Sequence, residues 1–327
     1  MAALFLNSAL RKRIDRVAVL QRARWCMEAG LLYLFWQFCA RLEPQAASAF
    51  GQRLLRRFGP HLGKTAHVRR NLGLAFPRVS ESERDVLLRE VWGSAGAVLA
   101  EYPHLKAICH DDVDGHVEIV ERWNLNEYRA GRRHGVFVSA HVGNWELAAA
   151  AGRQGVPMTV IYAPSKNPYV DRMLRRWREA LGCGLVSLEE GVRPLIRELS
   201  EGRSVGLVVD TRDDDGAPIS FFDLDKLTTL APARLALRFG CELIPVRIER
   251  LGAARFRLTV HEPVRPDPAL ASDRDRAMQM MGAVNRLFEQ WIRERPEQWL
   301  CMKRAWPKRL EPGSIRGTLA RVPEPTA

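Results

Sequence analysis

The sequence predicts an α/β fold in which a mainly parallel central sheet is flanked by helices, preceded by a helical N-terminal region. Three observations lead to this prediction. The first hundred of the 327 residues show helical periodicity with short breaks, whereas from about residue 114 short β-branched or apolar runs alternate with helical stretches. Hydrophobic residues make up 46% of the chain, as in folded domains rather than disordered ones. Alternation of strands and helices favours a parallel sheet covered on both faces.

The N-terminal region, residues 1–105, is expected to form helices at about 15–41, 45–58, 64–75 and 81–101. Ser80 followed by Glu83 fits a capping box, which marks the start of the last of these helices. An α/β domain is expected over residues 106–310. The remaining residues, 311–327, have no apolar periodicity and several Pro and Gly residues, so they are predicted to be a mobile tail.

Within the α/β domain, strands and helices alternate. The expected strands are His116–Val120, Gly135–Ala140, Met158–Tyr162, Ser204–Val209, Leu243–Glu249 and Arg255–Val260. The expected helices are Asn144–Arg153, Pro168–Leu181, Val192–Ser200, Pro232–Phe239 and, as the longest, Asp273–Arg293.

The run Ala29–Ala40, AGLLYLFWQFCA, predicts a membrane-associating segment. It is shorter than the roughly 20 residues that cross a bilayer as a helix. Positive charge beside an apolar segment is held on the cytoplasmic side and attracts anionic head groups. The basic residues before the run are Arg11, Lys12, Arg13, Arg16, Arg22 and Arg24. We therefore expect a retained element that lies on the membrane or crosses it once. The alternative is a core helix whose buried face is formed by Leu31, Leu32, Leu34, Phe35 and Phe38.

The chain is basic: 50 Lys and Arg residues against 38 Asp and Glu residues give a formal net charge of +12. This balance favours negatively charged partners such as phosphorylated substrates, acidic proteins, an anionic membrane or nucleic acid. Arginine is spread along the chain without a recognised nucleic-acid-binding motif, so no specific nucleic-acid partner is expected. The six cysteines include no C-x-x-C pair, which indicates neither a disulfide framework nor a structural zinc site.

The segment GVFVSAHVGNWE, residues 135–146, is where chemistry is expected. A buried strand ends in His141, Gly143 permits a tight turn, and Asn144 is a good N-cap for the helix that carries Glu146. Open α/β sheets bind their ligands at this end of the strands. A carboxylate that holds one imidazole nitrogen leaves the other free to take a proton, so the pair predicts a general base and its orienting acid. The alternative is a structural histidine and an acid that stabilises the helix N-terminus.

These residues, HVGNWEL, resemble the H-x-x-x-x-[DE] block of glycerolipid-type acyltransferases, in particular the lipid A biosynthesis lauroyl/myristoyl acyltransferases. Further blocks follow the family's order over nearly the whole chain. They are NLGLAFP (71–77), HVGNWEL itself, KNPYVD (166–171), VVD (208–210) before Phe221 and Phe222, Thr228–Arg234, LIPV (243–246) and RPEQWLCMKRAW (295–306). Several spaced blocks in order are more specific than one histidine.

The resemblance implies acyl transfer from an acyl carrier protein thioester to a hydroxyl of a Kdo-modified lipid A precursor, at the cytoplasmic face of the inner membrane. It implies His141 and Glu146 as catalytic residues, with neither a cofactor nor a metal. The implied partners are the acyl carrier protein, an anionic phosphoglycolipid acceptor and the membrane surface. The substrate-binding candidates are Asn144, Lys166, Arg178, Asp210 and Arg304. Arg178 could instead belong to a solvated basic helix face, and Asp210 could be a turn former.

The sequence departs from the family pattern at three places. Ala163 replaces an arginine that is frequent before K-N-P, and Glu189 and Glu190 lie where a basic residue is common. The closing block carries Cys301, Lys303 and Ala305 in place of an aromatic residue, a histidine and a second arginine. The alternatives therefore include an acyltransferase for another lipid acceptor (a lysophospholipid, an ornithine lipid or a glycolipid), a non-catalytic membrane scaffold and a basic nucleic-acid-binding protein. Phe221, Phe222 and Leu224 are expected either to line an acyl pocket or to belong to the core.

Overall fold

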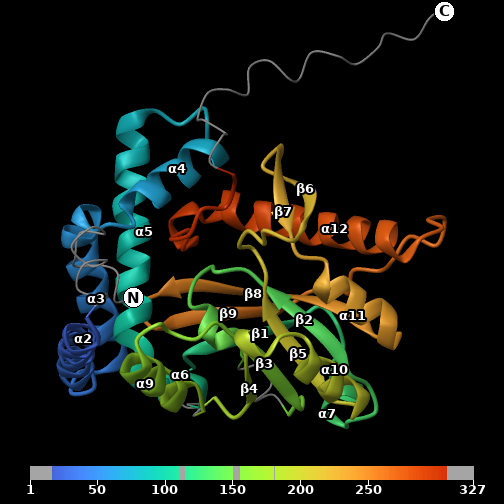
Figure 1. Cartoon of the computed structure of the whole chain (residues 1–327), viewed down its shortest axis with the longest axis horizontal. Helices are drawn as coiled ribbons and strands as arrows, with labels where there is room; N and C mark the ends of the chain where they lie inside the picture. The colour runs from blue at the N-terminus through green and yellow to red at the C-terminus, as the bar shows by residue number, and fades with distance from the viewer. Residues whose placement is uncertain (1–16, 111–114, 150–154, 180, 308–327) are drawn as a thin grey trace, which may run out of the picture.

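A seven-stranded sheet lies at the centre of the fold (Figure 1). The computed structural model describes residues 17–110, 115–149, 155–179 and 181–307. The sheet order is β1-β9-β8-β2-β5-β3-β4. Strands β8, β2, β5, β3 and β4 run parallel, β9 pairs antiparallel with β8, and β1 runs parallel to β9. The strands are β1 (Val117–Glu121), β2 (Gly135–Ser139), β3 (Met158–Tyr162), β4 (Gly184–Ser187), β5 (Ser204–Val208), β8 (Glu242–Gly252) and β9 (Arg255–Val260).

The six strands expected from sequence are confirmed, and the mainly parallel sheet is confirmed with them. Three further strands were not predicted: β4, and an antiparallel hairpin of β6 (Ala217–Phe221) and β7 (Leu224–Thr228). In Figure 1 this hairpin stands beside α12, away from the main sheet.

The expected N-terminal helices are confirmed as α2 (Ala18–Cys39), α3 (Pro44–Phe58), α4 (Thr65–Ala75) and α5 (Glu81–Glu101). The capping box at Ser80 is present: the Glu83 N–H donates to Ser80 Oγ at 3.3 Å, and the Ser80 N–H donates to Glu83 Oε2 at 3.0 Å. Short helices η2 (Gly59–His61), η3 (Tyr102–His104) and α6 (Leu105–His110) complete this region.

The remaining helices are α7 (Asn126–Arg129), η4 (Trp145–Ala149), α9 (Pro168–Glu179), η5 (Leu188–Glu190), α10 (Arg193–Ser200), α11 (Ala231–Phe239), α12 (Asp273–Glu294) and η6 (Pro296–Gln298). Helices α10 and α11 pack against β5, β2 and β8, whereas α9 packs beside β4 and α2. The helix expected over residues 144–153 is a 3₁₀ helix through Ala149, and the residues after it lie outside the described part of the chain.

One continuous hydrophobic core contains side chains from both the N-terminal helices and the sheet. It includes Trp36 of α2, Trp92 of α5, Val138 of β2 and Trp291 of α12. The boundary expected near residue 105 stays a prediction, and the expected mobile tail lies outside the described residues.

Helix α2 exposes much of its apolar surface. Leu31, Leu34 and Phe38 have exposed fractions of 59%, 65% and 46%, and only Leu32 and Phe35 of the expected core-facing set pack partly against the core. The buried side of α2 instead carries Ala29, Trp36 and Cys39. A core helix therefore does not explain the apolar run. No helix in the described ranges is long and apolar enough to span a membrane.

The basic cluster before the run is only partly described. Arg24 is buried and paired with Glu28, with an Nη1 to Oε1 distance of 2.5 Å, so it does not face a lipid surface. Arg22 is exposed. Residues 11–13 and 16 lie outside the described residues.

Candidate active site

His141 and Asp210 meet at the carboxyl end of the central sheet. His141 follows β2, Asp210 follows β5, and these strands are parallel neighbours in the sheet. The strand pairing continues into the site, because the Val209 N–H donates to the Ser139 carbonyl at 2.9 Å. His141 Nδ1 lies 2.6 Å from Asp210 Oδ1, and the His141 backbone N–H donates to the same oxygen at 3.1 Å.

The environment of Asp210 fixes the tautomer of His141. Burial by itself raises the pKa of the Asp210 carboxyl, but His141, Lys226 and Trp299 favour the ionised form and lower this pKa to about 2. An ionised carboxylate only accepts hydrogen bonds, so the proton of the shared bond lies on Nδ1. Nε2 has no hydrogen-bond partner among the described residues, and the side chain is 27% exposed. An imidazole in this tautomer can accept a proton at Nε2.

The expected hydrogen bond between Glu146 and His141 was wrong. Glu146 is buried, and its carboxylate accepts from Arg178 Nε at 2.8 Å, from Arg178 Nη2 at 2.6 Å and from the Tyr102 hydroxyl at 2.6 Å. Burial opposes ionisation of Glu146, but these donors outweigh it and lower the pKa of the carboxyl. Arg178 binds both carboxylate oxygens of Glu146, and the carboxylate that contacts the His141 ring is that of Asp210.

Arg178 does not belong to a solvated helix face. Its side chain is only 12% exposed; burial opposes the charged form, but the ion pair with Glu146 outweighs burial and raises the pKa of the guanidinium. Its guanidinium carbon lies 5.4 Å from the centroid of the Tyr162 ring. Nη1 is buried and has no hydrogen-bond partner among the described residues. Arg178 lines the pocket, and Nη1 is the nitrogen of its guanidinium that makes no hydrogen bond within the described residues.

The segment after α12 closes the site from the other side. Trp299 Nε1 donates to Asp210 Oδ2 at 3.0 Å, and the Leu300 N–H donates to the His141 carbonyl at 2.8 Å. The Gly143 N–H donates to the Gln298 carbonyl at 3.1 Å. Gly143 has a φ of +57°, and a Cβ there would lie 2.6 Å from the Ile248 carbonyl oxygen, so this turn requires glycine.

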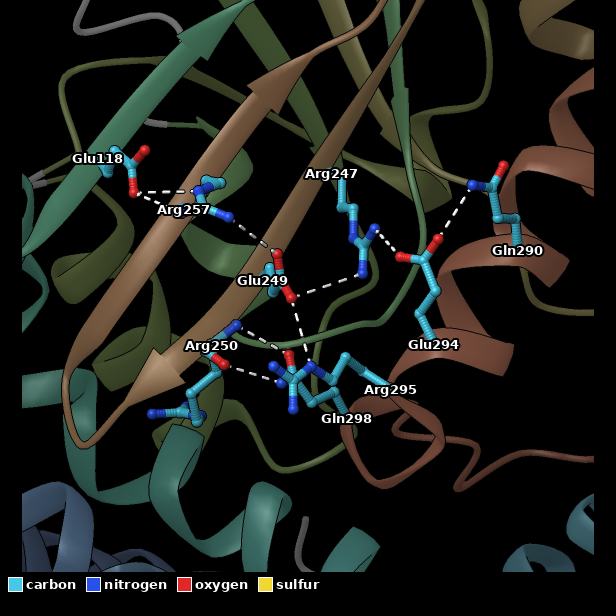
Figure 2. A network of polar contacts seen from close by, with 9 residues as sticks. All are labelled: Glu118, Arg247, Glu249, Arg250, Arg257, Gln290, Glu294, Arg295 and Gln298. Carbon is cyan, nitrogen blue, oxygen red and sulfur yellow. Dashed lines mark hydrogen bonds and ion pairs between the residues drawn. The ribbon is translucent and has the colours of Figure 1, made fainter.

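Polar contacts with β8 anchor this segment, as Figure 2 shows. Gln298 bonds the backbone of Arg250 twice: its Oε1 accepts from the Arg250 N–H at 2.8 Å, and its Nε2 donates to the Arg250 carbonyl at 2.9 Å. Arg295 Nε lies 3.4 Å from Glu249 Oε1. These contacts hold Trp299, one residue further on, against Asp210.

The side chain of Asn144 forms hydrogen bonds that stabilise the local fold. Its Oδ1 accepts from the Glu146 N–H at 3.3 Å, as expected for the residue before a helix, and its Nδ2 donates to Glu101 Oε2 at 2.9 Å. Glu101 is fully buried and is also held by Ser48 and Arg250. Asn144 itself is fully buried and does not line the pocket.

A pocket of about 500 Å³ opens beside His141, Glu146, Arg178 and Asp210. Most of its lining is apolar and includes Met158, Val160, Leu174, Leu181, Leu185 and Gly206. Lys64 and Lys303 are its lysines. No group of three or more His, Cys, Asp and Glu residues within the described ranges is arranged to hold a metal ion.

The other two substrate-binding candidates from the sequence lie outside the pocket. Lys166 is exposed and Arg304 is half-buried, and neither lines the pocket. Phe221, Phe222 and Leu224 are buried in the core, where Phe222 stacks on Trp299 at a centroid distance of 6.0 Å. Sequence reasoning missed Tyr102, Trp299 and Lys303. Trp299 and Lys303 lie in the closing block, so that block was the available signal, whereas no motif singled out Tyr102.

The known proteins that this chain resembles are acyltransferases. A sequence model of a family described as "Bacterial lipid A biosynthesis acyltransferase" matches residues 17–308. The chain is 26% identical to "Lipid A biosynthesis myristoyltransferase" of Escherichia coli, over 80% of this chain and 81% of the relative. It is also 26% identical to "Phosphatidylinositol mannoside acyltransferase" of Mycolicibacterium smegmatis, over 62% and 68% of the two chains. A crystal structure of a 1-acyl-sn-glycerophosphate acyltransferase from Thermotoga maritima aligns with a TM-score of 0.34 at 15% identity, covering 81% of this chain and 97% of that one.

Proposed function

This chain belongs to the bacterial lipid A biosynthesis acyltransferase family and is therefore an acyltransferase with a lipid acceptor, and we propose that it moves a fatty acyl chain from an acyl carrier protein thioester to a hydroxyl of a Kdo-modified lipid A precursor. The observation that carries the proposal is the His141–Asp210 pair beside an apolar pocket of about 500 Å³. An imidazole held in this way activates a hydroxyl, and an apolar pocket accommodates a fatty acyl chain.

In the proposed reaction, His141 Nε2 takes the proton of the acceptor hydroxyl as that oxygen attacks the thioester carbonyl. Asp210 stabilises the imidazolium that forms. Arg178 lines the pocket and its Nη1 has no hydrogen-bond partner among the described residues, so Arg178 is the proposed donor to the oxyanion. When the tetrahedral intermediate collapses, the carbon–sulfur bond breaks and the thiolate of the donor takes the proton from His141. The products are an ester on the acceptor and free acyl carrier protein thiol.

Charge complementarity supports an anionic acceptor and an acidic donor protein. Lys64 and Lys303 line the pocket, and the chain carries a net charge of +12. Phosphate and carboxylate groups are bound by such side chains. The second candidate is transfer to another lipid acceptor. The M. smegmatis relative favours it, because its name specifies a phosphatidylinositol mannoside and its identity of 26% equals that of the myristoyltransferase.

The experiment is acyl transfer by the detergent-solubilised protein with a panel of acyl carrier protein thioesters. Each thioester is offered with a Kdo-modified lipid A precursor, a lysophospholipid and a phosphatidylinositol mannoside. We expect the highest kcat/KM with the lipid A precursor. A higher kcat/KM with either of the other lipids would replace the proposed acceptor.

We place the enzyme at the cytoplasmic face of the inner membrane, with α2 lying in the interface. Leu20, Met27, Leu31, Leu34 and Phe38 follow one side of this helix and are all exposed. A helix with such a side lies in the plane of the membrane surface with its apolar residues among the acyl chains.

Replacing both Leu31 and Leu34 by glutamate is expected to weaken binding to vesicles at least about tenfold, because each buried leucine contributes about 1.5–3 kcal/mol. The measurement is co-sedimentation with vesicles of phosphatidylethanolamine and phosphatidylglycerol. Val86→Glu is the control, since Val86 is an exposed apolar residue of α5. Equal binding of the double variant and the wild type would remove α2 from the membrane contact.

Gly206 is expected to influence the length of the acyl chain. It lies in β5 beside Phe137 of β2 and Val160 of β3, and it lines the pocket. A Cβ at Gly206 would lie 2.9 Å from Val160 Cγ1 and 3.3 Å from Met158 Sδ, so these side chains would move into the pocket. In Gly206→Ala, the ratio of kcat/KM for a 14-carbon donor to that for a 10-carbon donor is expected to fall about tenfold, since each buried methylene contributes about 0.8 kcal/mol. Gly252→Ala, where a Cβ meets open space, is expected to keep the wild-type ratio.

A further inference from the structure

Lys226 is a fully buried lysine directed at the backbone of Asp210. It lies on β7, where it pairs with Ile219 of β6, and its exposed fraction is 0%. Its Nζ donates to the Asp210 carbonyl oxygen at 3.0 Å and lies 4.2 Å from the centroid of the Phe221 ring. Lys226 does not line the pocket, so a ligand bound there would not contact it.

The charged groups around Lys226 come from two other elements. Asp210 follows β5, and Glu289 lies on α12. Glu289 is buried and already accepts from Arg293 Nη1 at 2.7 Å. No salt bridge within 4.0 Å joins the ammonium to either carboxylate in the described residues, and its hydrogen bond goes to a backbone carbonyl instead.

Burying an ammonium group without a salt bridge is unfavourable for the free energy of folding. Taking an ammonium group out of water costs several kcal/mol, and an apolar side chain of similar volume is often neutral or stabilising at such a position. Burial lowers the pKa of Lys226 to about 8, so the ammonium form still predominates at neutral pH. A contribution to fold stability therefore does not explain why a lysine lies at this position. The site residue that it contacts is Asp210.

We propose that Lys226 is a positioning residue for the reaction: it fixes the turn at Asp210 and supplies the positive charge that keeps the Asp210–His141 pair in its working protonation state. The hydrogen bond to the Asp210 carbonyl holds the backbone from which the carboxylate reaches Nδ1 of His141. The ammonium charge favours the ionised form of Asp210, whose carboxylate keeps the proton of the shared hydrogen bond on Nδ1 of His141. This inference rests on the proposed role of His141 as the base.

The test follows modification of His141 by diethyl pyrocarbonate as a function of pH, with the modified peptide identified by mass spectrometry. The reagent attacks the neutral imidazole, so the profile reports titration of the pair without needing a substrate. The variants are Lys226→Met, which removes charge and donor, and Lys226→Gln, which keeps a donor. Asp225→Ala is the control, because Asp225 is an exposed neighbour on the same strand.

Removal of a positive charge favours the protonated form of the pair. In Lys226→Met the pH of half-maximal modification is therefore expected to rise by about half a unit or more. We expect the same rise in Lys226→Gln and none in Asp225→Ala. With the acceptor that the wild type uses, kcat of Lys226→Met is expected to fall about tenfold or more with little change in KM, and Lys226→Gln is expected to recover part of kcat. The thermal midpoint of Lys226→Met is expected to match or exceed that of the wild type.

An unshifted modification profile in both variants overturns the role of Lys226. A lowered thermal midpoint in Lys226→Met with an unshifted profile in Lys226→Gln would make Lys226 a structural residue only. Failure of the proposed function has a different signature, namely a wild-type enzyme that is inactive with every acceptor or a His141→Ala variant that stays active.

Discussion

Asp210→Asn is expected to lower the rate of acyl transfer on the order of 10³- to 10⁴-fold while the protein remains folded. Asparagine has nearly the same shape, but its amide donates a hydrogen bond where the carboxylate accepted one. The imidazole proton then moves to Nε2, and the nitrogen that faces the pocket can no longer take the proton of the acceptor. The measurement is steady-state kcat/KM with a radiolabelled thioester, with near-ultraviolet circular dichroism to confirm folding.

Glu146→Gln is the matched comparison, since the two carboxylates are the rival partners of His141. Glu146 holds Arg178 and Tyr102 and makes no hydrogen bond to the imidazole, so its loss is expected to reduce the rate by about tenfold to a hundredfold, through displacement of Arg178. A folded Glu146→Gln variant that loses as much activity as Asp210→Asn would restore Glu146 as the orienting acid.

Arg178→Met is expected to destabilise the fold by about 3–5 kcal/mol, because it leaves the buried carboxylate of Glu146 without its main partner. Urea denaturation measures the change in the free energy of unfolding. The double variant Arg178→Met/Glu146→Leu is expected to recover most of this loss, since both buried charges are then replaced by apolar groups.

The surface pair Arg132–Glu127 provides the control. Its side chains are 64% and 48% exposed, so Arg132→Met is expected to leave the free energy of unfolding nearly unchanged. If Arg178→Met were as mild as Arg132→Met, the ion pair at the site would be no stronger than a solvated one.

Secondary-structure elements that are specified by a short stretch of neighbouring residues could be predicted from the sequence. The strand before His141 is a buried apolar run followed by a turn, and it was predicted within one residue. The hairpin at Phe221–Leu224 was missed because its turn residues, Phe222 and Asp223, have φ values of 55° and 58°, where sequence rules expect Asn-Gly or Asp-Gly. Strand β4 is only four residues long and lies at the edge of the sheet, so its pattern was too short to identify.

The site was predictable to the extent that its residues are close in sequence. His141 was identified from the end of a strand, but Glu146 was assigned as its partner because it lies five residues away. Asp210 was correctly placed at the end of a strand, yet its contact with His141 depends on β2 and β5 being neighbours. Spacing does not determine that order, because β3 and β4 lie between β2 and β5 in the sequence although β2 and β5 are neighbours in the sheet. Lys226 depends on the unpredicted hairpin, so nothing in the sequence suggested it.

We propose that His141 is the general base for acyl transfer to a lipid hydroxyl, and the identity of the acylated product tests this role. The detergent-solubilised enzyme is incubated with a labelled acyl carrier protein thioester and a Kdo-modified lipid A precursor, and mass spectrometry separates acylated lipid from free fatty acid. We predict that the label enters the lipid as an ester with the wild type and that His141→Ala forms none above the rate without enzyme. Release of the label only as free fatty acid would exclude transfer to this lipid, and ester formation that survives loss of His141 would exclude His141 as the base.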